Sequence, residues 1–350
     1  SGENPIAYGF SNSNTGSLHF LNFLFMQIYA IDVSKEHLDI FSKSEDGKIF
    51  QKRIKNSFNS ICRLLSALEP KDLICAEFTG VYTNLLRHLS AMYGIKIALA
   101  SGFDIKHSLG NRKGKSDKLD AERIWEYASR FSDKLNFVLP DSEMLQELKM
   151  LFNLRNQLVK SLKTLHTSHT MIKLNPYLSI AENSIRAQTE AFIKGQIKQT
   201  ENQLFELIES KSEFSRNFAL VTSITGIGKV TALELIISTG NFKRINSARK
   251  AAAYAGVCPY PNQSGNIAKK SRIHFRANKK LKSLLHICAK TICIHNKEFK
   301  LYRERKMLEG KHFYLVMNNV SNKLLRTVYA VVDSQKPFDP NIIIHDPRFL

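Results

Sequence analysis

Three features are scarce in this chain of 350 residues: cysteines, acidic side chains relative to basic ones, and long apolar runs. Only five cysteines occur and none are spaced as CxxC. This count excludes a disulfide scaffold or a zinc finger and favours a reducing compartment. No uncharged apolar run reaches the roughly 18 residues needed to cross a bilayer, so no membrane span is expected. Hydrophobic residues still make up 43% of the chain, which excludes wholesale disorder.

The shortage of acidic residues leaves a large positive charge. Lysine and arginine number 51 against 31 aspartates and glutamates, for a net charge of +20 and a pI near 9.7. Such an excess predicts a polyanionic partner, with DNA or RNA first. An anionic membrane surface is second, but no basic amphipathic anchor supports it. Composition alone also fits a protein that has a positive surface and no such partner.

The first half of the chain has the pattern of an α/β domain. Residues 1–25 are rich in Ser, Asn and Gly, and we set them aside as an extension or expression remnant. Beyond them, apolar or alternating runs predict strands at 28–33, 37–42, 48–54, 73–78 and 96–101, with helices at 57–68, 82–93 and 117–131. Three strands followed by helix–strand–helix–strand predict an RNase H-like (resolvase-like) fold over residues 26–135.

The second half is predicted to be mainly helical. Leucines recur at steps of three and four over 145–165, a second apolar stripe covers 181–211, and Asn175-Pro176 separates them. We therefore predict a long helical hairpin or coiled coil at 136–215, with an ordinary bundle as the alternative. Residues 216–335 are predicted to form a basic helical domain, and the sequence predicts no conformation for the tail at 336–350.

Four acidic residues stand where carboxylates carry chemistry. Asp32 and Glu77 lie near the ends of apolar strands, where an unpaired carboxylate is costly. Asp117 and Asp120 are three apart at a helix start and so share a face. Hard oxygen ligands of this kind suit Mg²⁺ or Mn²⁺. Each acid alone also fits a cap, an ion pair or a first-turn charge, but the set of four favours a metal centre.

Basic residues gather in three segments that are typical of phosphate contacts. The first is a loop at 104–118, the second is a GxG turn between two apolar-periodic helices, and the third comes after a Pro/Asn-rich loop. The predicted nucleic-acid-binding residues are Arg112, Lys113, Lys115, Gly226, Gly228, Lys229, Lys269, Lys270, Arg272, Arg276 and Lys279. A solvated charged loop and ordinary turns are the alternatives.

Ser264 lies in that third loop, next to Gly265 and before the run of cations. A serine becomes a nucleophile only with help from a base, a metal or stabilisation of the developing charge. The cations and the carboxylate centre are able to supply that help. The alternative is a simple Ser-Gly turn.

Several motifs together resemble one protein family. They are IDVSKEHLDI (31–40), AEFTGVY (76–82), KSDKLDA (115–121), SITGIGKVTA (223–232) and AAYAGVCPYPNQSG (252–265). In this order they resemble the DEDD-type transposases of insertion sequences that act as RNA-guided DNA recombinases, relatives of a pilin-gene invertase.

The resemblance implies a full mechanism. Asp32, Glu77, Asp117 and Asp120 would form the metal centre, and Ser264 in a transposase domain would attack DNA and form a covalent phosphoserine link. The partners implied are donor and target DNA, a structured guide RNA, and further copies of the chain in a dimer or tetramer. A cytoplasmic, nucleoid-associated bacterial protein is expected. The alternatives are a metal-dependent nuclease that uses water, and a non-catalytic nucleic-acid-binding protein.

Overall fold

The computed structural model describes residues 27–109, 117–138, 141–172, 177, 179–258, 260–264, 267–272 and 276–340. Side chains are not described for residues 117–118, 169–172, 260–264 and 267–272. The chain divides into two compact units, Ser1–Pro140 (unit 1) and Asp141–Leu350 (unit 2), which are taken in turn.

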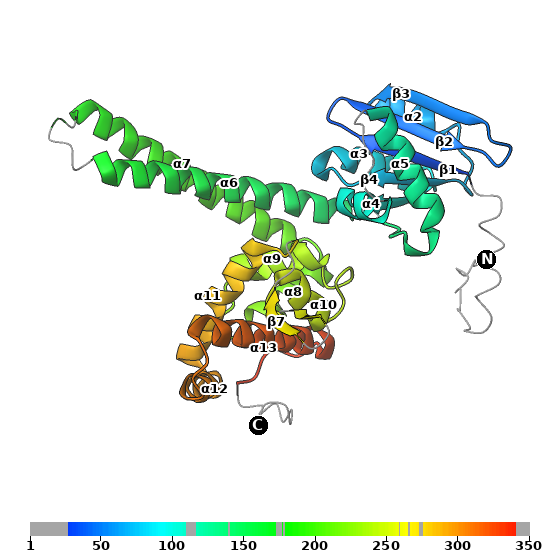
Figure 1. Ribbon diagram of the computed structural model, residues 1–350. Helices are drawn as coiled ribbons and strands as arrows, with labels where there is room; N and C mark the ends of the chain where they lie inside the picture. Colours follow the sequence, from blue (N-terminus) through cyan, green and yellow to red (C-terminus); the bar gives the residue numbers. More distant parts are fainter. Residues whose placement is uncertain are drawn as a thin grey trace, which may run out of the picture. The chain divides into compact units, whose positions relative to one another are not determined.

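Unit 1 is built on a mixed five-stranded sheet (Figure 1). The strands are β1 (Ile28–Val33), β2 (His37–Lys43), β3 (Ile49–Lys55), β4 (Leu73–Glu77) and β5 (Lys96–Ala100). Their order is β3-β2-β1-β4-β5: the first three pair antiparallel, while β4 and β5 run parallel to β1. This confirms the predicted meander followed by helix–strand–helix–strand, with strand bounds within one residue of those expected.

Alternation along the strands divides the unit into two layers of core. Ile31, Val33, Ile74 and Ala76 face α2 (Phe58–Leu65) and α3 (Asn84–Met92), which follows the short 3₁₀ turn η1 (Gly80–Thr83). Ala30, Cys75 and Ala98 face the other side, under α4 (Gly102–Leu109) and α5 (Asp117–Arg130). A second 3₁₀ turn, η2 (Ser132–Lys134), follows α5. Side chains two apart on one strand share a face, so the second layer fixes which strand residues meet α5.

Helix α4 corrects the predicted loop at 104–118. Residues up to Leu109 are helical, and Ile105 is 6% exposed in the core beneath the sheet. One buried side chain in eight residues leaves too little periodicity for a sequence pattern to show. The rest of that predicted loop, with Arg112, Lys113 and Lys115, lies outside the described residues.

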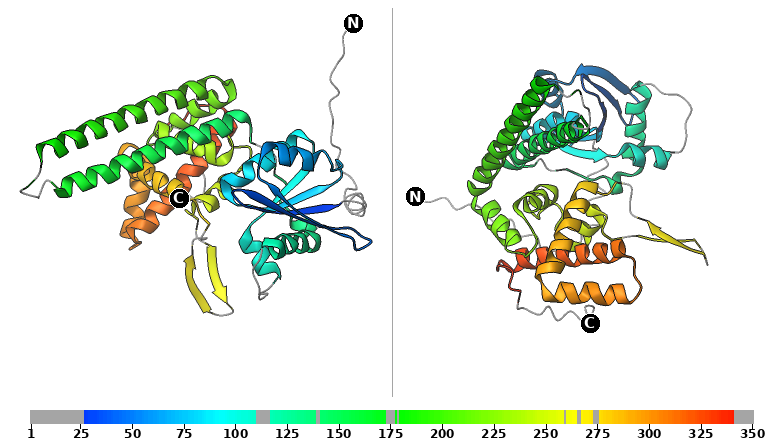
Figure 2. Two further views of the ribbon diagram at one scale, coloured as in Figure 1. Left: turned by 90° about the horizontal axis from the view of Figure 1, so that it is seen from above. Right: turned by 90° about the vertical axis from the view of Figure 1, so that its left-hand side faces the viewer.

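Unit 2 begins with two helices of 30 residues each, α6 (Glu143–Ile172) and α7 (Ile180–Glu209). They lie side by side along their length (Figures 1 and 2), which confirms the helical hairpin expected from the leucine spacing. Arg155 ties them together through Glu201 at 2.8 Å. No helix among the described residues is both long and apolar enough to cross a membrane.

The rest of unit 2 is a helical body with one core. Its helices are α8 (Ser212–Thr222), α9 (Lys229–Thr239), α10 (Ala248–Ala255), α11 (Lys279–His295), α12 (Lys297–Leu308) and α13 (Phe313–Ser334). Leu204 and Ile208 of α7 join Leu148 and Phe152 of α6 in the core beneath them. The helical character predicted for this region is therefore confirmed.

A β-hairpin interrupts the helices and corrects the predicted loop around Ser264. Strands β6 (Tyr260–Ser264) and β7 (Ile267–Arg272) pair antiparallel, with Ser264 opposite Ile267. The hairpin projects away from the helices of unit 2 (Figure 2). Its strands are mostly polar, so they lack the apolar alternation that predicts strands. Two residues, Gly-Asn, separate the paired ends, and this dipeptide was the available hairpin signal.

Candidate active site

Two of the four predicted carboxylates lie on adjacent strands. In the parallel pair of β1 and β4, Ile31 is in register with Ala76, so Asp32 and Glu77 are the next residues along each strand. Asp32 alternates with Ala30, and Glu77 alternates with Cys75, both of which face α5. The two carboxylates therefore share one face near the carboxyl ends of neighbouring strands.

Helix α5 brings the third carboxylate to the same face. It packs over β1 and β2 through Ile124 and through Trp125, whose ring meets Phe41 edge-on with centroids 5.9 Å apart. Asp120 lies immediately before the buried Ala121. Its Oδ1 forms an ion pair with Arg123 Nη1 at 3.2 Å. Asp117 is the first residue of α5, one turn before Asp120, and its side chain lies outside the described residues.

The electrostatics of Glu77 show that these acids share one region. Partial burial, and then the negative charges of Asp32 and Asp120, raise the pKa of Glu77 above its usual 4.5. A carboxyl whose pKa is raised by two like charges is destabilised in its ionised form. The arrangement therefore favours a positive charge, or a proton, among the three.

This donor set suits a hard divalent cation, because every candidate ligand is a carboxylate oxygen. Among the side chains that the structure describes, no group of three acids, histidines or cysteines is close enough to form a complete metal site. Asp117, the fourth predicted ligand, is not among those side chains. The chemistry of the donors therefore fits the predicted Mg²⁺ or Mn²⁺, but the three acids whose side chains are described do not by themselves form a site.

Gly102 is a part of this site that the sequence analysis missed. It opens α4, two residues after Ala100, which is in register with Glu77. A Cβ at position 102 would collide with Glu77 Oε1 and lie 3.1 Å from Glu77 Cδ. The glycine therefore makes room for the carboxylate. A glycine directly after a strand was the only sequence signal for it.

We expect Gly102→Ala to displace the Glu77 carboxylate and to weaken Mn²⁺ binding by about 10–100-fold, the range for residues that orient metal ligands. Titration calorimetry with Mn²⁺ measures this. Gly195→Ala is the comparison for glycine loss alone, since no atom lies within 4 Å of a Cβ there and its φ is not in the left-handed region. Unchanged Mn²⁺ affinity in Gly102→Ala would show that Glu77 is not held by this contact.

The predicted GxG turn joins two helices, α8 and α9, as expected. Gly226 has φ 90°, and a Cβ there would lie 3.0 Å from the Cys288 carbonyl oxygen, so only glycine fits against α11. Gly228 is the N-cap residue of α9, and the Lys229 ammonium lies 4.8 Å from the Phe205 ring centre. Part of the glycine requirement is therefore packing, and phosphate binding by this turn stays a prediction.

The remaining predicted residues belong to the hairpin and to the segment that leads into α11. Lys269, Lys270 and Arg272 lie on β7 and Ser264 ends β6, with side chains that are not described. Arg276 and Lys279 are exposed before and at the start of α11. Ser264 belongs to unit 2 and the four acids to unit 1. A meeting of serine and acids therefore stays a prediction.

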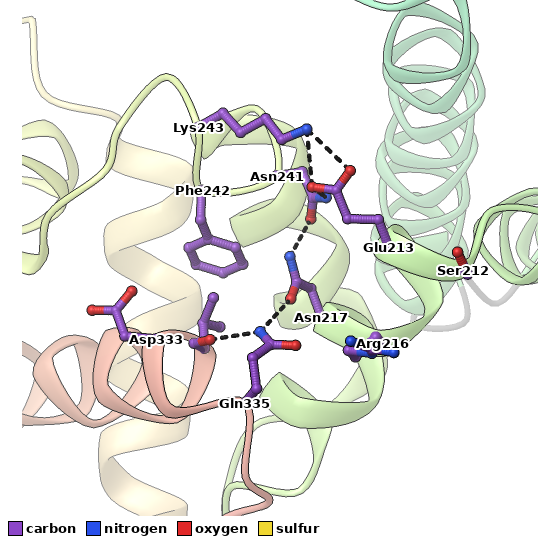
Figure 3. A pocket seen from close by; sticks show the side chains of 10 residues that line it. Ser212, Glu213, Arg216, Asn217, Asn241, Phe242, Lys243, Asp333 and Gln335 are labelled. Carbon is purple, nitrogen blue, oxygen red and sulfur yellow. Dashed lines mark hydrogen bonds and ion pairs between the residues drawn. The ribbon is translucent and has the colours of Figure 1, made fainter. Parts of the chain in front are cut away.

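A pocket of about 460 Å³ in unit 2 holds none of the predicted site residues (Figure 3). The start of α8, the turn after α9 and the end of α13 line it. Asn217 donates to Asn241 at 3.0 Å, Asn241 donates to Glu213 at 3.2 Å, and Gln335 donates to Asn217 at 3.4 Å. Because these amides hydrogen-bond to one another, the pocket is a polar junction of three helix ends.

Comparison with known proteins identifies the class of the molecule. Residues 29–173 match a family described as "Transposase", of the DEDD type of IS110, and residues 218–304 match the family "Transposase IS116/IS110/IS902 family". The first match contains all four predicted acids and the second contains Ser264. Both regions of the chain are therefore those of transposases.

Individual relatives agree over most of the chain. The pilin gene-inverting protein of Moraxella bovis is 29% identical over 76% of this chain and 81% of its own length. The transposase for insertion sequence element IS1111A of Coxiella burnetii is 23% identical over 89% of this chain and 91% of its own length. The transposase for IS1328 of Yersinia enterocolitica is 24% identical over 87% and 96%. Over most of its length the chain is therefore similar to insertion-sequence transposases of the IS110/IS116 family, which confirms that part of the resemblance. The serine nucleophile and the guide RNA stay predictions.

Proposed function

We propose that this transposase cuts and rejoins DNA with an RNase H-like carboxylate centre in unit 1 and a serine nucleophile in unit 2. The observation that carries the proposal is the grouping of Asp32, Glu77 and Asp120 on one face, where burial and then the charges of Asp32 and Asp120 raise the pKa of Glu77. Repulsion between acids lowers the stability of the folded protein, and carboxyl groups with perturbed pKa values cluster at functional sites.

All four acids have the same part in the proposed reaction, that of metal ligands. Asp32, Glu77, Asp117 and Asp120 would hold Mg²⁺ or Mn²⁺, which when bound would neutralise charge on the attacked phosphate. Asp32 and Glu77 are fixed by strand backbone, and Asp120 by the packed helix α5. Ligands on strands and helices are held more rigidly than ligands on loops, as a reaction at a fixed phosphorus requires.

Ser264 supplies the nucleophile. Its hydroxyl oxygen attacks phosphorus, the bond from phosphorus to one deoxyribose oxygen breaks, and the departing oxygen takes a proton while the serine loses one to a base. A phosphoserine diester replaces the DNA phosphodiester, so attack by another strand's hydroxyl reverses the step and joins new ends. The cations of β7 and the start of α11 come after the serine in the chain and are suited to hold the DNA backbone.

Partner choice follows from the charge and from the family. The net charge of +20 suits two nucleic acids at once, and a structured guide RNA that pairs with donor and target DNA would leave no sequence code in the protein. The α6–α7 hairpin offers a long surface for a dimer or tetramer in which one copy's serine meets another's acids. The proposed site of action is chromosomal DNA in the bacterial cytoplasm.

The decisive experiment incubates the protein with Mg²⁺, labelled DNA carrying the element's ends, and the transcript that flanks them. A denaturing gel then separates protein-linked DNA from free fragments. Protein-linked DNA supports the serine recombinase. Free cut DNA alone supports a nuclease that uses water, and uncut DNA bound with a steep salt dependence supports a non-catalytic binder.

A further inference from the structure

A row of charges crosses three strands on the face that carries the acids. Asp32 of β1 is in register with Asp39 of β2, and Asp39 is in register with Arg53 of β3. Residues directly opposite one another on paired strands point to the same face. Asp39 and Arg53 therefore share the face of Asp32, and β3 is the edge strand on that side of the sheet.

Asp39 holds the Arg53 guanidinium in one orientation. Arg53 Nε donates to Asp39 Oδ1 at 2.8 Å, and Nη2 donates to Oδ2 at 2.9 Å. The Asp39 side chain is 11% exposed, whereas the Arg53 side chain is 50% exposed. A bidentate contact to a buried carboxylate fixes the plane of a guanidinium. The Asp39 side chain is thus buried, whereas the Arg53 side chain reaches solvent.

Two charge repulsions act near Asp39 and Arg53. Asp39 faces the like charge of Asp32 across the strands, which destabilises the sheet unless a cation neutralises it. A phosphodiester that approaches the acids is repelled for the same reason. Arg53 relieves the first repulsion, and its exposed position at the edge of the sheet lets it meet the second. Lys55, two residues along, is exposed on the same face.

We propose that Arg53, positioned by Asp39, binds the DNA backbone beside the carboxylate centre, with Lys55 extending the contact along β3. The inference rests on the proposed function in that it names where the substrate strand enters the site. Neither Asp39 nor Arg53 touches the reacting atoms: Asp39 is a positioning residue and Arg53 a phosphate-binding one.

The test is Arg53→Gln against Lys52→Gln. Lys52 is the neighbouring residue of β3, and it is in register with Ile40, whose face packs on α2 and α3. Both variants lose one positive charge from one exposed strand. Binding of a short DNA duplex without divalent ions is measured at several salt concentrations. We expect Arg53→Gln to lower the slope of log affinity against log salt by about 0.9 and Lys52→Gln to leave it unchanged.

Two further variants keep the test decisive. Arg53→Gln leaves Asp39 buried without its cation, so the double variant Asp39→Asn/Arg53→Gln, with both charges removed, serves if the single one unfolds. Arg53→Lys retains the charge and should restore the slope. If the wild type binds DNA and the Arg53 and Lys52 variants have equal salt slopes, the inference about Arg53 is wrong while the proposed function still stands. If the wild type needs Mg²⁺ and the flanking transcript to bind, the slopes are compared with both present. A wild type that still binds no DNA would overturn the proposed function.

Discussion

Glu77→Gln is expected to abolish DNA cleavage while making the metal-free protein more stable. Residues that merely orient metal ligands cost about 10–100-fold when lost, so loss of a direct ligand should exceed 100-fold. The amide carries no charge and so escapes the burial and the repulsion from Asp32 and Asp120 that raise the pKa of Glu77. We expect its Tm at pH 7 without divalent ions to rise by about 1–3 °C.

The pH dependence of this stability gap has a definite sign. Because the folded-state pKa of Glu77 lies above its usual 4.5, the ionised carboxylate is less stable in the folded protein than in the unfolded chain. The wild type therefore loses stability as pH rises through the folded-state pKa, whereas the glutamine side chain of the variant does not titrate. The difference in Tm should be largest at neutral pH and should vanish below pH 4.5, where both side chains are neutral.

Added metal should reverse the order of the two proteins. Mn²⁺ binds the folded wild type and raises its Tm by mass action, while the variant, short of one ligand, gains little. Glu45→Gln is the matched control, since Glu45 is exposed in the turn between β2 and β3. A variant at Glu77 that cleaves DNA at the wild-type rate would show that Glu77 holds no catalytic metal.

The strands were predictable because their apolar patterns are local. Positions 28–33 and 73–77 are nearly continuous apolar runs with a carboxylate at or near the end, and Asp46-Gly47 marks the turn before β3, where Gly47 has φ 83°. Helix α4 and the β6–β7 hairpin were missed because neither depends on a repeated apolar face. The hairpin pairs through backbone hydrogen bonds between polar residues, which a hydrophobic pattern cannot show.

The site was predictable to the extent that its residues are unusual for their local element. Asp32 and Glu77 stand out as charges in apolar strands, and their closeness then follows from the parallel pairing of β1 with β4. Gly102 and the Asp39–Arg53 pair were not predictable in that way. Asp39 and Arg53 are 14 residues apart, and only the strand register brings them together. Sequence thus identifies candidate ligands better than the residues that position them.

Ser264→Ala is expected to remove protein-linked DNA altogether and to lower strand transfer by on the order of 10⁴-fold or more, as loss of a nucleophile does elsewhere. The substitution takes away one hydroxyl at the end of β6 and leaves the backbone pairing with Ile267 in place. Labelled DNA on a denaturing gel measures both quantities. Ser271→Ala, on the paired strand β7, is the control for loss of a hydroxyl from the same hairpin.

The Ser264 and Glu77 variants separate the two halves of the proposed mechanism. Ser264→Ala keeps every acid of unit 1, so it should retain the rise in Tm with Mn²⁺ that Glu77→Gln loses. Cleavage by Ser264→Ala at the wild-type rate would mean that water attacks the phosphate and that unit 1 alone is a nuclease. Loss of the Mn²⁺ response in Ser264→Ala would instead mean that the hydroxyl supports the metal centre and is not the nucleophile. Loss of linked DNA with the Mn²⁺ response intact is the pattern that only a serine nucleophile predicts.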